Sequence, residues 1–124
     1  MTNIAFFRCT VCGNIMVHFL HDRVKLKCCE QSMTKLEPNA DGAEEIHIPV
    51  VMKESDNLHV EVGAQLHPML PEHHIELIVT DTFNTTEISY LKPGMEPKAD
   101  FKDGSSTGTV YEYCNVHGLW KTEF

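Results

Sequence analysis

Near its C-terminus the chain reads Tyr113-Cys114-Asn115-Val116-His117-Gly118-Leu119-Trp120-Lys121, in which two residues separate a cysteine from a histidine and an apolar tryptophan follows. Three further histidine-containing stretches lie upstream, and they read Glu45-Ile46-His47-Ile48-Pro49, His67-Pro68-Met69 and His73-His74-Ile75-Glu76. Imidazole and thiolate both bind transition metals. Four imidazoles and one thiolate therefore predict a five-coordinate metal centre. His73 and His74 would supply one ligand between them, because neighbours on a strand point to opposite faces.

The ligand set of this predicted centre indicates what it would bind. Four neutral imidazoles and one thiolate around a divalent ion leave a net charge of about +1 and, for an octahedral metal, one open position, which suits a small anion. Iron fits, because it changes oxidation state and accepts six ligands. A blue-copper loop is the alternative, but such loops place a methionine shortly after the histidine, and none follows His117 here. The histidines without a motif are interpreted as ordinary polar residues; they are His18, His21, His59 and His74.

The other four cysteines lie near the N-terminus, as Cys9-Thr10-Val11-Cys12-Gly13 and, fifteen residues later, the adjacent pair Cys28-Cys29. A Cys-x-x-Cys turn supplies two thiolates to a tetrahedral metal and commonly carries a glycine just after it. The adjacent pair would supply the other two, since neighbouring cysteines can hardly form an unstrained disulfide with each other. Two disulfides, or simple buried thiols, are the alternatives. A zinc ion and an iron ion would fit four thiolates equally well.

Composition excludes several classes of function. The chain has 124 residues and a formal net charge of −8, with scattered lysines, which disfavours nucleic-acid binding. No apolar run approaches the roughly 18 residues of a membrane span, and no export signal is visible at the start. An odd cysteine count favours metal ligation or catalysis over a disulfide framework. We therefore expect a cytoplasmic protein that binds neither membranes nor nucleic acid.

The chain divides into a small module and a larger β domain. Residues 1–36 hold four cysteines and few large apolar side chains, so this module needs a metal or a partner subunit to close its core. Residues 37–44 cluster Pro, Asn, Asp and Gly and are predicted to be a linker. Residues 45–124 predict an immunoglobulin-like antiparallel β-sandwich, since short strands alternate with turn signals. The expected strands are 46–52, 58–62, 75–81, 87–91, 98–101, 109–114 and 119–124.

Period-two alternation supports these strands. One predicted buried face carries Ile46, Ile48, Val50 and Met52, and another begins with Ile75, Leu77 and Val79.

Together these motifs resemble the desulfoferrodoxin family, the two-iron form of superoxide reductase, over almost the whole chain. The desulforedoxin module is matched over residues 1–36 by Cys9-x-x-Cys12-Gly13-Asn14 and Cys28-Cys29-x-x-x-Met33. The neelaredoxin-like catalytic module is matched over residues 45–124. Its motifs here are Glu45-x-His47-x-Pro49-Val50, His67-Pro68-Met69, His73-x-Ile75-Glu76 and Cys114-Asn115-x-His117-Gly118-Leu119-Trp120.

The resemblance implies two iron ions per chain. The catalytic iron would have four equatorial imidazoles and an axial thiolate, from His47, His67, His73, His117 and Cys114. A second iron, or a zinc ion in its place, would be held by Cys9, Cys12, Cys28 and Cys29. Glu45 matches the glutamate that occupies the sixth position once the iron is oxidised. Ile46 is a departure, because the family usually has there a lysine that attracts superoxide and helps to deliver a proton.

The function implied is the one-electron reduction of superoxide to hydrogen peroxide at the ferrous centre, followed by re-reduction by a donor such as rubredoxin. A homodimer is expected, because the small N-terminal module is too short to stand alone. The alternatives are a non-enzymatic electron-transfer or metal-binding protein of the same fold, and a zinc-stapled binding module.

Overall fold

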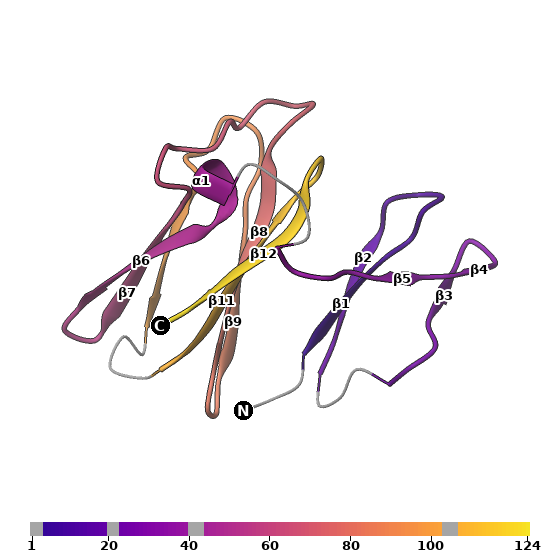
Figure 1. Ribbon diagram of the computed structural model, residues 1–124, viewed down its shortest axis with the longest axis horizontal. Helices are drawn as coiled ribbons and strands as arrows, with labels where there is room; N and C mark the ends of the chain where they lie inside the picture. The colour runs from indigo at the N-terminus through magenta and orange to yellow at the C-terminus, as the bar shows by residue number, and fades with distance from the viewer. Residues whose placement is uncertain (1–3, 20–22, 40–43, 103–106) are drawn as a thin grey trace. The chain divides into compact units, whose positions relative to one another are not determined.

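The structure is a computed structural model that describes residues 4–19, 23–39, 44–102 and 107–124, with the backbone alone for Glu44 and Glu45 (Figure 1). His21 lies outside the described residues. The described chain forms two compact units that divide between Glu37 and Pro38. Each unit has its own small set of antiparallel sheets, and within the described residues no helix is long and apolar enough to cross a membrane.

The N-terminal unit consists of short strands around a very small core. Strands β1 (Ala5–Arg8), β2 (Ile15–His18) and β5 (Thr34–Lys35) form a sheet in the order β2-β1-β5, and β3 (Lys27–Cys28) pairs with β4 (Gln31–Ser32). The buried cluster is limited to Ala5, Phe7, Cys9 and Met33, with a few half-buried neighbours. A core of this size is a weak source of stability, so the four cysteines are the natural means of holding the unit together.

The C-terminal unit is a sandwich of two antiparallel sheets. Strands β6 (Pro49–Glu54), β7 (Asn57–Val62) and β10 (Lys98–Lys102) form one sheet in the order β10-β7-β6. The other sheet has the order β12-β11-β8-β9, built from β8 (Ile75–Thr82), β9 (Thr86–Tyr90), β11 (Gly108–Cys114) and β12 (Gly118–Glu123). The predicted mainly β class, with a small cysteine-rich module before an antiparallel sandwich, is therefore confirmed.

Side chains from both sheets share the core of the sandwich. Leu58, Val60 and Phe101 come from one sheet, and Ile78 and Val110 come from the other; all five are almost fully buried. Burial of each such side chain contributes about 1.5–3 kcal/mol relative to exposure. The sandwich is thus a rigid support for the loops at its ends.

The predicted strand over residues 46–52 is wrong at its start. A short helix, α1 (Glu44–His47), takes up these positions, and β6 begins at Pro49. The helix lies close to the turn after β7, where a Cβ atom on Gly63 would be 2.5 Å from the carbonyl oxygen of Ile46. Gly63 also has a φ of +85°, a conformation that other residues rarely adopt.

The predicted inward face of this strand is wrong as well. Val50 and Met52 are 37% and 40% exposed, whereas Pro49 is buried and Val51 is partly buried against the core. A shift of one residue moves every side chain of a strand to the opposite face. The helical turn before Pro49 produces that shift, and the alternating sequence pattern cannot report it.

Candidate metal centres

The five predicted ligands of the histidine centre come together at one end of the sandwich. His47 ends α1, His67 lies in the loop after β7, His73 lies just before β8, Cys114 ends β11, and His117 lies in the turn between β11 and β12. Figure 1 shows α1 and the β11–β12 turn at the same end of this unit. Residues distant in the sequence are therefore brought to one place by the antiparallel topology.

Backbone hydrogen bonds hold the loops that carry these ligands. The His67 N–H donates to the carbonyl oxygen of Val62 at 3.2 Å, and His73 exchanges two bonds with Leu70 at 2.9 and 3.1 Å. Gly118 closes the β11–β12 turn with a φ of +83° and pairs with Cys114. The loop between this pair is three residues long, and a left-handed residue directly after a short hairpin turn is common.

The four imidazoles lie at the corners of a square. Going around it, the ring centroids of His47 and His67 are 4.7 Å apart, His67 and His73 4.6 Å, His73 and His117 5.1 Å, and His117 and His47 4.8 Å. The diagonal from His47 to His73 is 6.4 Å. Ligand atoms of His47, His73, Cys114 and His117 all lie within 4.8 Å of one another. His67 takes the remaining corner, with its Nε2 3.1 Å from Nε2 of His47.

Hydrogen bonding and burial leave ring nitrogens at this centre that a metal could bind. Nδ1 of His67 donates to the carbonyl oxygen of Pro68 at 2.7 Å, because a carbonyl can only accept. In the neutral imidazole the proton is then on Nδ1, and Nε2 keeps a lone pair that can bind a metal. Burial lowers the pKa of His67 to about 4 and also lowers the pKa of His73. His73 Nε2 and His117 Nδ1 are buried and have no hydrogen-bond partner within the described part of the chain. Neutral imidazoles with unpaired buried nitrogens are what a metal site requires.

Cys114 is the buried thiol of the centre. Its sulfur accepts the backbone N–H of His117 at 3.4 Å. Burial raises the pKa of Cys114, and the N–H groups of His117 and Val116 oppose that rise. A thiolate in such a buried place needs a neighbouring cation, and a bound metal ion would supply it.

Two buried residues beside the centre were not assigned a role from the sequence. Trp120 stacks on His47 with ring centroids 4.8 Å apart, and its Nε1–H donates to the carbonyl oxygen of His117 at 3.1 Å. Glu112 lies opposite Trp120 on β11. Its carboxyl is fully buried without a hydrogen-bond partner among the described residues, and burial raises its pKa well above the ordinary value. No sequence pattern marks a buried Glu, because alternation with Tyr111 and Tyr113 predicts either face.

The two residues that the sequence placed next to the open coordination position lie in α1. The backbone of Glu45 belongs to this helix, but its side chain lies outside the described part of the structure. Ile46 is half-buried and directly precedes the ligand His47. The role of Glu45 therefore stays a prediction.

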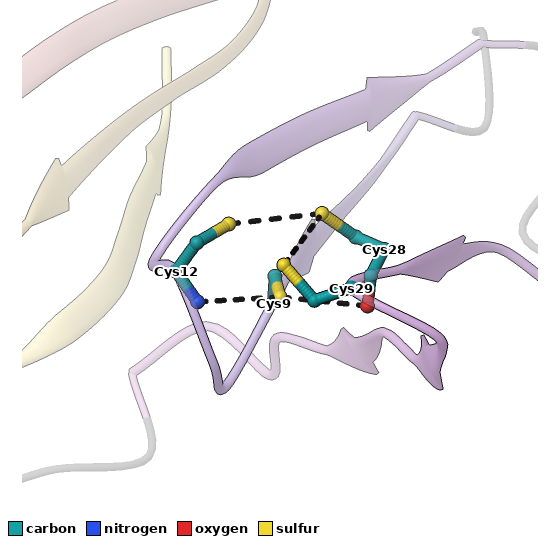
Figure 2. Close-up of side chains that lie close together, drawn as sticks. All are labelled: Cys9, Cys12, Cys28 and Cys29. Carbon is teal, nitrogen blue, oxygen red and sulfur yellow. Dashed lines mark hydrogen bonds between the residues drawn. The ribbon is translucent and has the colours of Figure 1, made fainter.

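In the N-terminal unit, the four cysteines converge on one point (Figure 2). Their sulfurs all lie within 4.8 Å of one another, with Cys12 and Cys28 3.7 Å apart and Cys28 and Cys29 3.9 Å apart. Each of the four is a free cysteine, which argues against the disulfide alternative.

Two turns build this four-cysteine site. In the first, Gly13 has a φ of +78° and donates to the carbonyl oxygen of Cys9, while the Cys12 N–H donates to the Cys9 sulfur at 3.5 Å. In the second, Cys29 and Glu30 join β3 to β4 with φ values of 53° and 62°. Two successive left-handed residues are the signature of a type I′ hairpin turn, which directs the neighbouring Cys28 and Cys29 sulfurs to one site.

The electrostatics of the four thiols favour a cation. Backbone hydrogen bonding, led by the N–H of Cys12, lowers the pKa of Cys9 to about 6. The neighbouring sulfurs, led by that of Cys12, raise the pKa of Cys29 to about 12. One thiolate thus forms easily and its neighbours resist a second negative charge. A metal ion at the centre would let all four ionise, so both cysteine and histidine sets fit a bound metal.

Comparison with known proteins covers both units. A family model described as the desulfoferrodoxin N-terminal domain matches residues 2–36, and the desulfoferrodoxin model matches residues 39–123. The chain is 43% identical to a desulfoferrodoxin of Clostridium acetobutylicum, over 79% of this chain and 78% of that protein. It is 39% identical to a desulfoferrodoxin homolog of Archaeoglobus fulgidus, over 94% of each.

A solved structure is similar along the whole length. The crystal structure of the superoxide reductase from Treponema pallidum matches with a TM-score of 0.83 and 25% sequence identity, and the match covers 98% of each chain. The fold is therefore that of a solved superoxide reductase.

Proposed function

The chain belongs to the desulfoferrodoxin family, and from this premise we propose that it is a superoxide reductase with a catalytic iron held by four histidines and one cysteine. The reaction takes up one electron and two protons for each superoxide and yields hydrogen peroxide. Iron is the cofactor proposed at this centre, and it would supply the electron by passing from the ferrous to the ferric state.

The square of four imidazoles beside one buried thiol carries this proposal. Cys114 lies within 4.8 Å of the ligand atoms of His47, His73 and His117, and it is fully buried, whereas His73 and His117 are half-buried. Cys114 would thus hold the iron from the buried side of the centre, together with the histidines. With five protein ligands, a six-coordinate iron would have one position left for another ligand. A small anion such as superoxide could bind there, because neutral imidazoles add no negative charge.

The residues of the chain then have distinct parts in the reaction. The thiolate of Cys114 would donate electron density to the iron, and the hydrogen bond from the N–H of His117 at 3.4 Å would tune that donation. Glu45 is proposed to occupy the sixth position after oxidation, because it is carried in α1 two residues before His47. Ile46 stands where a lysine would assist, so we propose that steering of superoxide is weaker in this chain.

The four-cysteine site is proposed to hold a second iron and to act as a stabiliser or an electron relay. Four protein thiolates fill a tetrahedral shell and leave no position for substrate. Zinc in that site would permit the first role alone. An external electron donor such as rubredoxin, a homodimer and a cytoplasmic location complete the proposal. Cysteines arranged as metal ligands suit a reducing compartment.

The decisive experiment is stopped-flow decay of superoxide with the pre-reduced protein, combined with metal analysis and an absorption spectrum. We expect rapid decay with hydrogen peroxide as the product and no dioxygen. Cys12→Ser should disturb the N-terminal site and largely retain this activity, whereas Cys114→Ser should lose it. Two bound iron ions with no acceleration of superoxide decay would instead favour a non-enzymatic electron-transfer or metal-binding protein. A colourless zinc protein would favour the zinc-stapled binding module.

A further inference from the structure

Asn115 makes three hydrogen bonds to the segment that carries His73. Its Oδ1 accepts the backbone N–H of His74 at 2.8 Å, and its Nδ2 donates to the carbonyl oxygen of Glu72 at 3.2 Å. Its own backbone N–H donates to the carbonyl oxygen of His74 at 3.1 Å. One residue thus bonds to the chain on both sides of His73.

The segment around His73 lies outside the regular strand ladder. Strand β8 begins at Ile75, so Glu72 and His74 lie before the ladder that pairs β8 with β11. The ladder itself is irregular there, since the register shifts between Tyr113 and Cys114. The backbone N–H and carbonyl of His73 both bond to Leu70, and Nδ1 of His74 donates to the carbonyl oxygen of Leu70 at 3.0 Å, so these bonds stay within the same loop. The bonds from Asn115 therefore join this loop to the turn that carries Cys114 and His117.

We propose that Asn115 is a positioning residue, which fixes His73 relative to Cys114 and His117 so that three ligands from two separate loops keep one geometry. An asparagine suits this place because its amide presents one acceptor and one donor about 2 Å apart, and so can bond an N–H and a carbonyl on either side of the same residue. The inference rests on the histidine–cysteine metal centre of the proposed function, and not on its reaction.

The chain contains a matched control in Asn39. Its Nδ2 donates to the carbonyl oxygen of Lys121 at 3.3 Å, its Oδ1 accepts the N–H of Lys121 at 2.8 Å, and its N–H donates to the carbonyl oxygen of Leu119 at 2.9 Å. These are again three bonds to the neighbours of one residue, Trp120. Strand β12 is, however, held independently along its length by the ladder to β11. Asn39 thus makes the same kind of hydrogen bonds as Asn115, but the segment that it bonds to is already held by a strand ladder.

The test compares Asn115→Ala with Asn39→Ala in the full chain, with Cd²⁺ as the metal probe. Cadmium NMR gives separate signals for four-sulfur coordination and for coordination by nitrogen and one sulfur, so competition with a chelator reports the affinity of each site. For Asn115→Ala we expect affinity at the mixed site to fall by about tenfold or more, the usual effect of removing a residue that orients a ligand. The four-sulfur signal should stay unchanged, and Asn39→Ala should leave both affinities close to those of the original chain.

An equal loss of affinity in Asn115→Ala and Asn39→Ala would overturn the proposal, because both variants would then act through general stability. If Asn115→Ala does not fold, Asn115→Asp replaces it: the carboxylate keeps the acceptor for His74 and loses the donor to Glu72. Measured at high ionic strength, where the added charge is screened, Asn115→Asp should also bind Cd²⁺ more weakly at the mixed site, and unchanged binding would contradict the proposal. A protein that binds metal as expected but does not reduce superoxide would refute the proposed function alone.

Discussion

The indole of Trp120 lies parallel to the imidazole of His47, with an interplanar angle of 11° and ring centroids 4.8 Å apart. The same indole donates its N–H to the carbonyl oxygen of His117. One buried side chain therefore contacts two of the four histidines at the centre. Because the chain has a single tryptophan, its fluorescence reports on this site.

We expect anaerobic addition of Fe²⁺ to quench the fluorescence of Trp120, because a paramagnetic ion bound by His47 would lie against the stacked indole. Cys12→Ser should retain the quenching, whereas Cys114→Ser should lose it while the four-cysteine site still binds metal. The two ligand sets share no residue, and this is the reason for the separation. Fluorescence titration with parallel metal analysis provides the measurement. Quenching of equal size in Cys114→Ser would contradict the assignment of the ligands.

Gly63→Ala is expected to destabilise the sandwich and to weaken metal binding at the histidine centre. The new methyl group would lie 2.5 Å from the carbonyl oxygens of Ile46 and Gln65, at a φ of +85°. Left-handed backbone costs about 1–2 kcal/mol in a non-glycine residue, and overpacking adds about 1–3 kcal/mol. Urea unfolding measures the first effect and competition with a chelator the second, because a displaced α1 moves His47.

Gly94→Ala is the matched control for this substitution. Gly94 has a φ of +90°, but no heavy atom lies within 4 Å of the position of a new Cβ. We therefore expect the conformational cost of about 1–2 kcal/mol without a change in metal affinity. If Gly94→Ala weakened metal binding as much as Gly63→Ala, the contact with Ile46 would not be the cause.

The convergence of the candidate ligands can be predicted from the sequence because their spacing carries information. Cys-x-x-Cys and the Cys114–His117 pair are short-range patterns, the stretches around His47, His67 and His73 add further imidazoles, and the family resemblance selects the ligands among them. The strands of the sandwich were likewise predicted from alternation and turn residues, to within a residue or two for all but β6. The prediction of a strand is wrong at α1, where alternating apolar residues occur across a helical turn that packs closely against the distant Gly63.

Other features depend on contacts that no local pattern encodes. The hairpin at Cys29 and Glu30 lacks the Asn-Gly or Asp-Gly pair that usually predicts a type I′ turn. The part played by Asn115 depends on Glu72 and His74, which are more than forty residues away along the chain. Glu112 is buried by the packing around it, although glutamate is usually exposed. The structures of these residues therefore follow from the folded chain and not from the local sequence.

The pH dependence of stability should include a contribution from His59. Its Nδ1 lies 2.6 Å from Asp100 and its Nε2 lies 2.9 Å from Glu61, while β6 presents the uncharged Met52 opposite it. Asp100, and then Glu61, raise the pKa of His59 in the folded protein. The stabilisation is therefore fully present below the unfolded pKa of about 6.5, and it disappears as the pH rises through the higher folded value.

His59→Gln should thus be less stable than the original chain at a pH of about 6, by about 0.5–1 kcal/mol for a partly exposed pair. The difference should shrink as the pH is raised toward about 9, where the imidazole is neutral in both states. Urea unfolding at several pH values gives the comparison. A stability difference that is independent of pH would show that the imidazolium does not contribute.

Ile46 offers the sharpest test of steering. Superoxide must approach a protein with a formal charge of −8, but at physiological salt the field of a charge decays over about 8 Å. Charge close to the iron should therefore outweigh the global balance, and Ile46 supplies none. We expect Ile46→Lys to raise the second-order rate with superoxide by about tenfold and to make that rate more sensitive to ionic strength.

The competing view is that another lysine, such as Lys92 or Lys121, already provides the charge. Lys121 is an unfavourable substitute, because its Nζ lies 3.7 Å from a carboxylate oxygen of Glu123, which offsets its charge. Under that view Ile46→Lys would change little, and Lys92→Ala or Lys121→Ala would slow the reaction. Stopped-flow rates of the original chain and Ile46→Lys, measured over a range of salt concentrations, distinguish the two. Equal rates with superoxide that depend equally little on salt in both proteins would contradict the steering hypothesis. A rate that depends more steeply on salt in Ile46→Lys would show that a charge at this position attracts superoxide.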